Sequence, residues 1–307
     1  MPATDSLRIG LQLPEAERAV RWPETVAMAQ LAEELGYDSL WVGDHLLYRV
    51  PGIAPKAPWE AWSMLAALAA ATGRISLGPL VASTSFHAPA MLAKKALTID
   101  EISGGRLILG LGAGWNEGEY RAFGFPFDHR VSRFVEAFTI IRTLLREGQV
   151  DFHGTWYQVE DCLLLPEPIS PGGPPLMVGS IGERMLRATL PHVDAWNIWY
   201  ADFQNDPLQF GVANTRVTRL CEELGRDPAS VSRTAAVLVG VAGATGRASL
   251  YETGATSPAL TGSTEDLAAG LRAFADQGAG HLQVVLDPIT IEAIHEIAPA
   301  ITLAKSL

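Results

Sequence analysis

The sequence has little cysteine and no hydrophobic run long enough to cross a membrane. Cys162 and Cys221 are its two cysteines, and they form no CxxC pair. A chain of 307 residues needs no disulfide to hold its fold, so we expect both thiols to be reduced and buried. Met1–Ser6 lacks the charged and apolar regions of a signal peptide. These absences predict a cytoplasmic protein that has no membrane partner.

Basic side chains are also scarce. The chain carries 23 lysines and arginines against 34 aspartates and glutamates, a formal net charge of −11. Because no basic run occurs, nucleic acid is not expected as a partner, and we interpret the negative charge as a source of solubility. The seven histidines are scattered, without an HxH or HExxH pattern, so no metal site is predicted. A serine nucleophile is not indicated either, because GxSxG is absent.

What is present is a regular alternation of apolar strands and amphipathic helices. Eight strands are predicted, each followed by a helix, at Leu7–Leu13, Ser39–Gly43, Ile75–Ala82, Leu107–Leu111, Leu176–Val178, Ala195–Ile198, Ala235–Val241 and His281–Leu286. We therefore predict an α/β fold, a (β/α)8 TIM barrel in one domain over residues 1–307. The turn-rich segment Val150–Pro175 is predicted to be an inserted hairpin and loop. The alternative fold is a doubly wound sheet in two halves.

In such a barrel the site lies where the strands end. Asp44 and His45 follow the second predicted strand, and they are the strongest candidate pair for acid–base chemistry in the sequence. A histidine exchanges a proton near neutral pH, and a neighbouring carboxylate orients it or raises its pKa. The alternative is structural, with Asp44 as a helix cap and His45 packed beside it. Gln12, Ser83, His87 and Asn197 are among the other polar residues at strand ends.

Two glycine-rich turns are further candidates. Gly179, Ser180, Ile181 and Gly182 open a helix directly after a strand, where free N–H groups favour an anion such as phosphate. Arg184 or Arg187 is expected to add positive charge there, unless the segment is an ordinary turn in which Ser180 caps the helix.

The second glycine-rich turn follows the fourth predicted strand. Its GxGxG spacing, over Gly110–Gly114, differs from the dinucleotide pattern GxGxxG. We interpret Gly112 and Gly114 as leaving room for a flat ring, with Trp115 closing the pocket. Glu117 and Glu119 are interpreted as capping the next helix.

Several segments together resemble the bacterial-luciferase-like flavin and deazaflavin oxidoreductases. The resemblance extends over nearly the whole chain in order. It rests on residues 31–45 (LAEELGYDSLWVGDH), 72–78 (TGRISLG), 89–94 (PAMLAK), 102–107 (ISGGRL), 112–115 (GAGW), 174–179 (PPLMVG) and 194–197 (DAWN).

The resemblance implies a (β/α)8 barrel that holds a flavin-type ring at its C-terminal mouth, with the family insertion at residues 150–175. It implies a cis peptide between Leu80 and Val81 against the ring. The residues it implies for cofactor binding are Asp44, Leu80, Val81, Ser83, Gly112, Ala113, Gly114 and Trp115, with the phosphate on Gly179, Ser180, Ile181 and Gly182.

Members that use coenzyme F420 resemble this chain in having Asp-His after the second strand, with the aspartate near the ring and the histidine facing the substrate. Asp44 and His45 take these places. The prediction is hydride transfer between F420 and a small organic substrate. FMN-dependent monooxygenation with a flavin reductase as partner is the first alternative, and a barrel that only binds its ligand is the second.

Two further expectations follow from the resemblance. F420-dependent sugar-phosphate dehydrogenases of the family carry a glutamate where this chain has Trp115, which argues against that substrate class. A homodimer is expected through helices near the second and third strands, including Trp59–Thr72.

Overall fold

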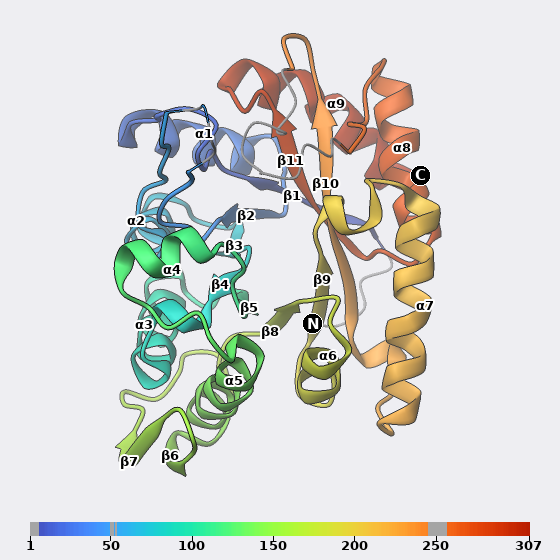
Figure 1. The fold of residues 1–307 in the computed structure, drawn as a ribbon. Coiled ribbons are helices and arrows are strands. Elements are labelled where there is room, and N and C mark those ends of the chain that lie inside the picture. Colours follow the sequence, from blue (N-terminus) through green and yellow to red (C-terminus); the bar gives the residue numbers. More distant parts are fainter. Residues whose placement is uncertain (1–5, 50–51, 53, 245–256) are drawn as a thin grey trace.

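A computed structural model describes residues 6–49, 52, 54–244 and 257–307. Its main sheet has nine strands in the order β3-β2-β1-β11-β10-β9-β8-β5-β4, and every neighbouring pair is parallel (Figure 1). The strands are β1 Arg8–Gln12, β2 Ser39–Val42, β3 Ser76–Pro79, β4 Ala82–Ser83, β5 Leu109–Gly112, β8 Leu176–Gly179, β9 Ala195–Ile198, β10 Ser232–Gly240 and β11 His281–Asp287.

The third predicted strand is divided into two short ones. β3 pairs with β2, and β4 pairs with β5, with the cis peptide Leu80–Val81 between them. A parallel bridge from Leu77 to Leu107 also joins the two ends of the sheet. The sheet is therefore barrel-shaped, with eight strand positions. The predicted (β/α)8 fold and the predicted cis peptide are both confirmed, and the doubly wound alternative is excluded.

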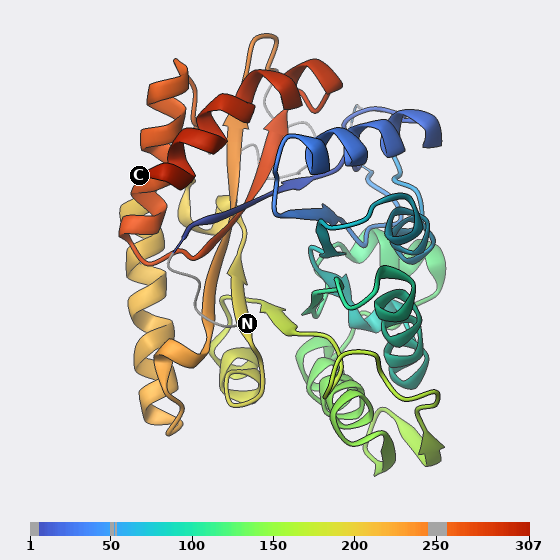
Figure 2. The ribbon, with the colours of Figure 1, turned by 180° about the vertical axis from the view of Figure 1, so that it is seen from behind.

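Helices surround this sheet on the outside (Figure 2). The bounds are α1 Trp22–Glu34, α2 Ala61–Ala71, α3 Pro89–Ser103, α4 Glu117–Phe123, α5 Arg130–Glu147, α6 Glu183–Thr189, α7 Pro207–Glu223, α8 Thr264–Asp276 and α9 Ile291–Ser306, with short 3-10 helices η1 Thr84–Phe86, η2 Tyr200–Phe203 and η3 Pro228–Ser230. Local sequence explains several ends. Gly104, Gly124 and Gly148 end α3, α4 and α5 in the left-handed conformation, which glycine adopts without steric cost.

The predicted insertion contains an antiparallel hairpin, as expected. Its strands are β6, Gln149–His153, and β7, Gln158–Leu163. The Glu136 carboxylate on α5 accepts the backbone N–H groups of residues 155–157 and so fixes the turn to the barrel. Both cysteines are free thiols; Cys221 is buried as predicted, but Cys162 is only half-buried because it lies on this exposed hairpin. Within the described ranges, no helix is long and apolar enough to cross a membrane.

The barrel interior holds a buried polar cluster below the site. Trp41 Nε1 donates to Ser39 Oγ at 2.7 Å, and Ser39 Oγ lies 2.7 Å from His281 Nε2. The Ser39 hydroxyl has one hydrogen and two lone pairs, so it accepts from the indole and still has a hydrogen that it can donate to His281 Nε2. Burial, aided by the charges of Arg8 and Lys305, holds the pKa of His281 well below its usual range.

Candidate active site

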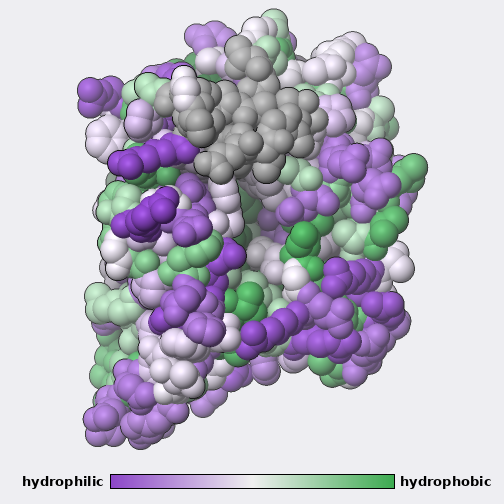
Figure 3. Space-filling view, in the orientation of Figure 1, coloured by the Kyte–Doolittle hydropathy of each residue, from purple (hydrophilic) through white to green (hydrophobic). Residues whose placement is uncertain are grey.

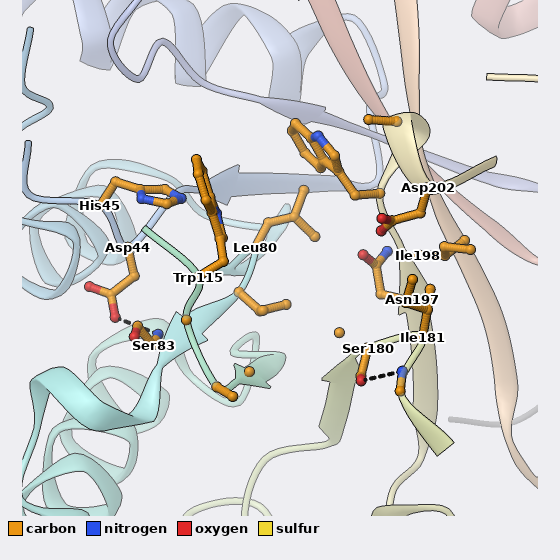
Figure 4. Close-up of a pocket in the computed structure, with 18 of the residues that line it drawn as sticks. Asp44, His45, Leu80, Ser83, Trp115, Ser180, Ile181, Asn197, Ile198 and Asp202 are labelled. Atoms are coloured by element: carbon orange, nitrogen blue, oxygen red, sulfur yellow. Dashed lines mark hydrogen bonds between the residues drawn. The ribbon is translucent and has the colours of Figure 1, made fainter. Parts of the chain in front are cut away.

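The strand ends and their following loops enclose a cavity of about 890 Å³. The space-filling view shows a hollow in the middle of this face (Figure 3). The predicted pair Asp44 and His45 and the residues that the resemblance implies for cofactor binding all line the cavity. In the close-up, Asp44, His45 and Trp115 lie on one side, Ser180, Ile181 and Asn197 lie on the other, and Leu80 lies between them (Figure 4).

His45 is held by two buried glutamates. Its Nδ1 lies 3.0 Å from Glu119 Oε2, and its Nε2 lies 3.8 Å from Glu15 Oε1. Glu119 Oε1 also accepts the backbone N–H groups of Leu46 at 2.6 Å and Leu47 at 3.0 Å. The side chain of His45 stays 21% exposed, against 4% for Glu15 and 1% for Glu119. The imidazole is therefore fixed from behind and remains accessible from the cavity.

These contacts set the protonation of His45. Burial lowers its pKa, but the carboxylate of Glu15 and the hydrogen-bonded carboxylate of Glu119 raise it by more, so the net pKa lies above the ordinary value. The imidazolium is stabilised near neutral pH. A histidine in this state donates a proton to a ligand in the cavity and takes it back in the reverse direction.

Glu15 belongs to a second set of contacts at the same end of the cavity. Its Oε1 accepts from the Tyr48 hydroxyl at 2.6 Å, and its Oε2 accepts from Gln12 Nε2 at 3.1 Å. The imidazole of His45 packs on Tyr48, with ring centroids 4.8 Å apart, and edge-on to Trp115 at 5.6 Å. Gln12 is 3% exposed, and no donor in the described part of the chain reaches its Oε1.

Asp44 contacts other groups than the sequence suggests. Its Oδ2 accepts the Ser83 backbone N–H at 2.9 Å and lies 3.0 Å from Nε2 of His87 (Figure 4 shows the first contact). Asp44 and His45 thus contact different partners. The prediction that the neighbouring aspartate orients His45 needs correction, since Glu119 supplies the hydrogen bond to the imidazole. The charge of Asp44 does act to raise the pKa of His45, as expected.

The glycines of the β5 turn lie against the chain's own side chains, and their contact with a ring stays a prediction. A Cβ on Gly112 would lie 2.7 Å from Val81 Cγ2, and one on Gly114 would lie 2.1 Å from the Tyr120 hydroxyl oxygen. Gly179 on β8 also faces Val81, at 2.9 Å. These glycines make room for the chain's own side chains, which in turn shape the cavity wall.

The positive charge near Gly179–Gly182 also comes from another residue than the sequence predicts. Arg187 is paired with Glu183 and Glu223, and Arg184 donates to Ser132 Oγ. Neither arginine is among the residues that line the cavity, so the predicted source of positive charge is wrong. Arg130 at the start of α5 lines the cavity instead, with its guanidinium bonded to Gly114 O at 2.6 Å and 4.2 Å from the centre of the Phe127 ring.

Sequence reasoning missed the roles of Glu15, Glu119 and Arg130. Glu15 comes three residues after β1, and this place near a strand end is the feature of the sequence that could have indicated its role. Glu119 was assigned to helix capping, but the side chain that caps α4 is that of Asn116, which accepts from Gly118 N–H. No local pattern distinguishes Arg130 from the other arginines, because its position depends on how α5 packs beside the β5 turn.

Comparison with known proteins agrees with this fold. The family model for luciferase-like monooxygenases matches residues 7–253, so the chain belongs to the luciferase-like monooxygenase family. A phthiodiolone/phenolphthiodiolone dimycocerosates ketoreductase of Mycobacterium tuberculosis (strain H37Rv) is 33% identical over 222 residues, which are 66% of this chain and 57% of that protein.

Pyrimidine monooxygenase RutA of Caulobacter sp. (strain K31) is 30% identical over 220 residues, which are 66% of this chain and 58% of that protein. The matched part therefore spans little more than half the length of both relatives.

Solved structures share the fold at lower identity. An F420-dependent secondary alcohol dehydrogenase in complex with an F420-acetone adduct has a TM-score of 0.82 at 18% identity, covering 97% of this chain and 99% of that one. Riboflavin lyase RcaE, with modified FMN and riboflavin, has a TM-score of 0.80 at 16% identity, covering 97% of this chain and 92% of that one. Proteins that share this fold thus include an F420-dependent dehydrogenase and a riboflavin lyase that holds modified FMN.

Proposed function

We propose that this protein transfers a hydride between coenzyme F420 and a small organic substrate, and that His45 moves the substrate proton. The observation that carries the proposal is the imidazole of His45, which lies between two buried carboxylates that raise its pKa, while one edge stays open to the cavity. A ketone reduced by hydride gains a proton on oxygen, and an alcohol loses one. A histidine at the cavity wall serves both directions.

The cavity fits a ring cofactor. The buried Oε1 of Gln12 has no donor partner among the described residues and lines the cavity, so it suits an N–H at the edge of such a ring. Leu80, Val81, Ser83 and the turn 112–115 would lie along the ring, and residues 179–182 would hold a phosphate, with Arg130 near Gly114 supplying positive charge. The bound cofactor would supply the hydride chemistry.

His45 would donate its proton to the substrate oxygen as that oxygen gains charge, or would accept the proton in the alcohol direction. Glu119 would keep the imidazole in place, since it also binds two backbone N–H groups of the same loop. Trp115 would limit water at the mouth, where it is 50% exposed and packs edge-on to His45. The relatives that are named a ketoreductase and a secondary alcohol dehydrogenase support a carbonyl or alcohol as the substrate class.

A fluorescence titration with F420 and with FMN tests the cofactor. We expect saturable binding of F420 and much weaker binding of FMN by the purified protein. Tight FMN binding without F420 binding would instead favour a monooxygenase that uses reduced flavin, consumes oxygen and needs a reductase partner. The similarity to RutA and to riboflavin lyase supports this second candidate.

A homodimer is part of the same proposal. Trp59 before α2 and Met91 on α3 are 54% and 56% exposed, and apolar side chains of this size on a surface suit a contact with a second copy. Sedimentation velocity measures the mass directly. A monomer over the micromolar range would contradict the proposal.

A further inference from the structure

A buried amide at the end of β9 lines the cavity and is not used by the proposed reaction. Asn197 is 3% exposed, and it lies across the cavity from His45, on the wall that also carries Ser180 (Figure 4). In the parallel pairing of β8 and β9, its partner is Gly179. Asn197 is therefore placed beside the segment 179–182 and away from the histidine that moves the substrate proton.

Both hydrogens of this amide are bonded inside the barrel. Asn197 Nδ2 donates to Thr234 Oγ1 on β10 at 2.7 Å and to Gln283 Oε1 on β11 at 2.7 Å. An asparagine side chain has two N–H hydrogens and one carbonyl oxygen. The two bonds therefore use all the hydrogens of the side chain, and its oxygen remains for a donor from elsewhere.

The hydroxyl of Thr234 supports this orientation of the amide. It donates its single hydrogen to Met177 Sδ, at 3.5 Å, so its lone pairs are left to accept from Asn197. Among the hydrogen bonds of the described residues, none reaches Asn197 Oδ1. In the close-up, this oxygen lies on the side of the amide that faces the cavity (Figure 4). Oδ1 is therefore a fixed acceptor in the cavity wall.

An acceptor in this position selects a ligand by the donor that the ligand carries. When a ligand displaces water from the wall, an amide oxygen without a new donor costs free energy. A ligand that places an O–H group against Oδ1 is therefore favoured over one that places a C–H group or another oxygen there. Beside the segment 179–182, the ligand would present the part that joins its ring to its phosphate. In both F420 and FMN this part is a polyol chain, whose hydroxyl groups donate.

We propose that Asn197 binds a hydroxyl group of the ligand through Oδ1, and that Thr234 and Gln283 are positioning residues that keep the amide nitrogen turned away from the cavity. Either the polyol chain of the cofactor or the substrate supplies this hydroxyl group. The identity of the ligand rests on the proposed function, whereas the orientation of the amide does not.

Hydrogen exchange of the side-chain amide, followed by ¹⁵N NMR of the whole protein without ligand, tests the orientation. Asn197→Ala assigns the signals. We expect both Nδ2 hydrogens to exchange slowly, because Thr234 and Gln283, which accept them, are 1% and 0% exposed. In Thr234→Val one hydrogen loses its partner and should exchange faster, whereas Thr234→Ser keeps the hydroxyl and should keep the protection. Rapid exchange of both hydrogens in the unaltered protein would mean that the nitrogen faces the cavity, and would overturn the proposal.

Fluorescence titrations with F420 and with FMN test the bond to the ligand. In Asn197→Ala, we expect the dissociation constant of the cofactor that the unaltered protein binds to rise by roughly 5- to 100-fold, the effect of one buried polar group left unpaired. The same ring with a methyl group in place of its whole side chain should bind both proteins equally. Asn214→Ala is the matched control, because that amide donates to Gln277 O and is not among the residues that line the cavity.

Steady-state kinetics with propan-2-ol and propane-1,2-diol separate the two sources of the hydroxyl group. If the substrate supplies it, Asn197→Ala should leave the dissociation constant of the cofactor unchanged and should lower kcat/KM for the diol alone. If neither the dissociation constant nor the preference for the diol changes, Asn197 binds no hydroxyl group and the proposal fails. A protein that binds neither cofactor would contradict the proposed function, and the exchange measurement would still decide the orientation of the amide.

Discussion

At the scale of single residues, His45 gains its chemistry from groups distant in the chain. Asp44 is its neighbour in sequence, but Glu15 and Glu119 are the groups that contact its ring. The raised pKa of His45 depends on these contacts, since burial alone would lower it. The adjacent aspartate points instead toward Ser83 and His87.

Replacing His45 should reduce turnover without preventing cofactor binding. In His45→Gln we expect kcat to fall by roughly 10²–10⁴-fold, the usual contribution of one general acid or base. The fluorescence titration should give a cofactor affinity close to that of the unaltered protein. Full turnover by His45→Gln with an identified substrate would remove His45 from the proton step.

Replacing Glu119 should change the pH dependence of the same step. Glu119→Gln removes a negative charge from Nδ1, so the pKa of His45 should fall, and the alkaline limb of the kcat/KM profile should move to lower pH. Glu117→Gln is the matched control, because Glu117 is exposed on the same helix. An identical profile in both variants would show that Glu119 has no influence on the titrating group.

At the scale of elements, the ends of β3, β4, β5 and β8 are packed around one side chain. Val81 follows the cis peptide between β3 and β4, and its methyl groups fill the space beside Gly110, Gly112 and Gly179. The strand ends are close because these glycines have no Cβ. The glycine pattern is visible in the sequence, but the side chain that packs against it is not, since Val81 lies in the segment between β3 and β4.

A methyl group at Gly112 should therefore destabilise the barrel. In Gly112→Ala the new Cβ meets Val81 at 2.7 Å, and such overpacking costs about 1–3 kcal/mol in the free energy of unfolding. Gly182→Ala is the control, since its Cβ would meet only Ser180 Oγ, at 3.6 Å. Urea unfolding measures the free energy of unfolding of both variants.

The double variant Gly112→Ala with Val81→Ala separates this clash from other causes. Removing the Val81 methyl groups should relieve part of the cost of Gly112→Ala, so the two changes should not be additive. Strict additivity would mean that Val81 is not the neighbour that limits Gly112.

At the scale of the whole molecule, buried histidines make stability depend on pH in opposite directions. His281 is neutral in the folded barrel, with a pKa well below the ordinary value of 6.5. The unfolded chain binds a proton there first as pH falls, so acid favours unfolding. His45 has a raised pKa, so its contribution is complete below pH 6.5 and is lost as pH rises through its folded-state pKa.

The His281 effect should appear in acid. Below about pH 6.5 the free energy of unfolding should decrease by roughly 1.4 kcal/mol per pH unit for this one proton. His281→Gln should reduce that slope, because glutamine does not titrate in this range. His153→Gln, with a side chain 62% exposed on the hairpin, is the matched control. Equal slopes in both variants would assign the acid sensitivity to other groups.

The sequence by itself determined the barrel and the place of the site. Apolar strands alternating with helices define a (β/α)8 sheet, and the ends of its parallel strands meet at one face. That rule brought Asp44, His45 and the turns at Gly112 and Gly179 into one cavity. Local signals are sufficient for this step, because each strand end is set by its own segment of chain.

Only the tertiary structure decided which groups surround each candidate catalytic side chain. Glu119 reaches His45 from α4, His87 reaches Asp44 from the segment after η1, and Arg130 reaches the β5 turn from α5. These contacts depend on how elements that are distant in the chain pack together, and no periodicity in the sequence encodes that packing. The raised pKa of His45 follows from such contacts, so it too was beyond the reach of the sequence.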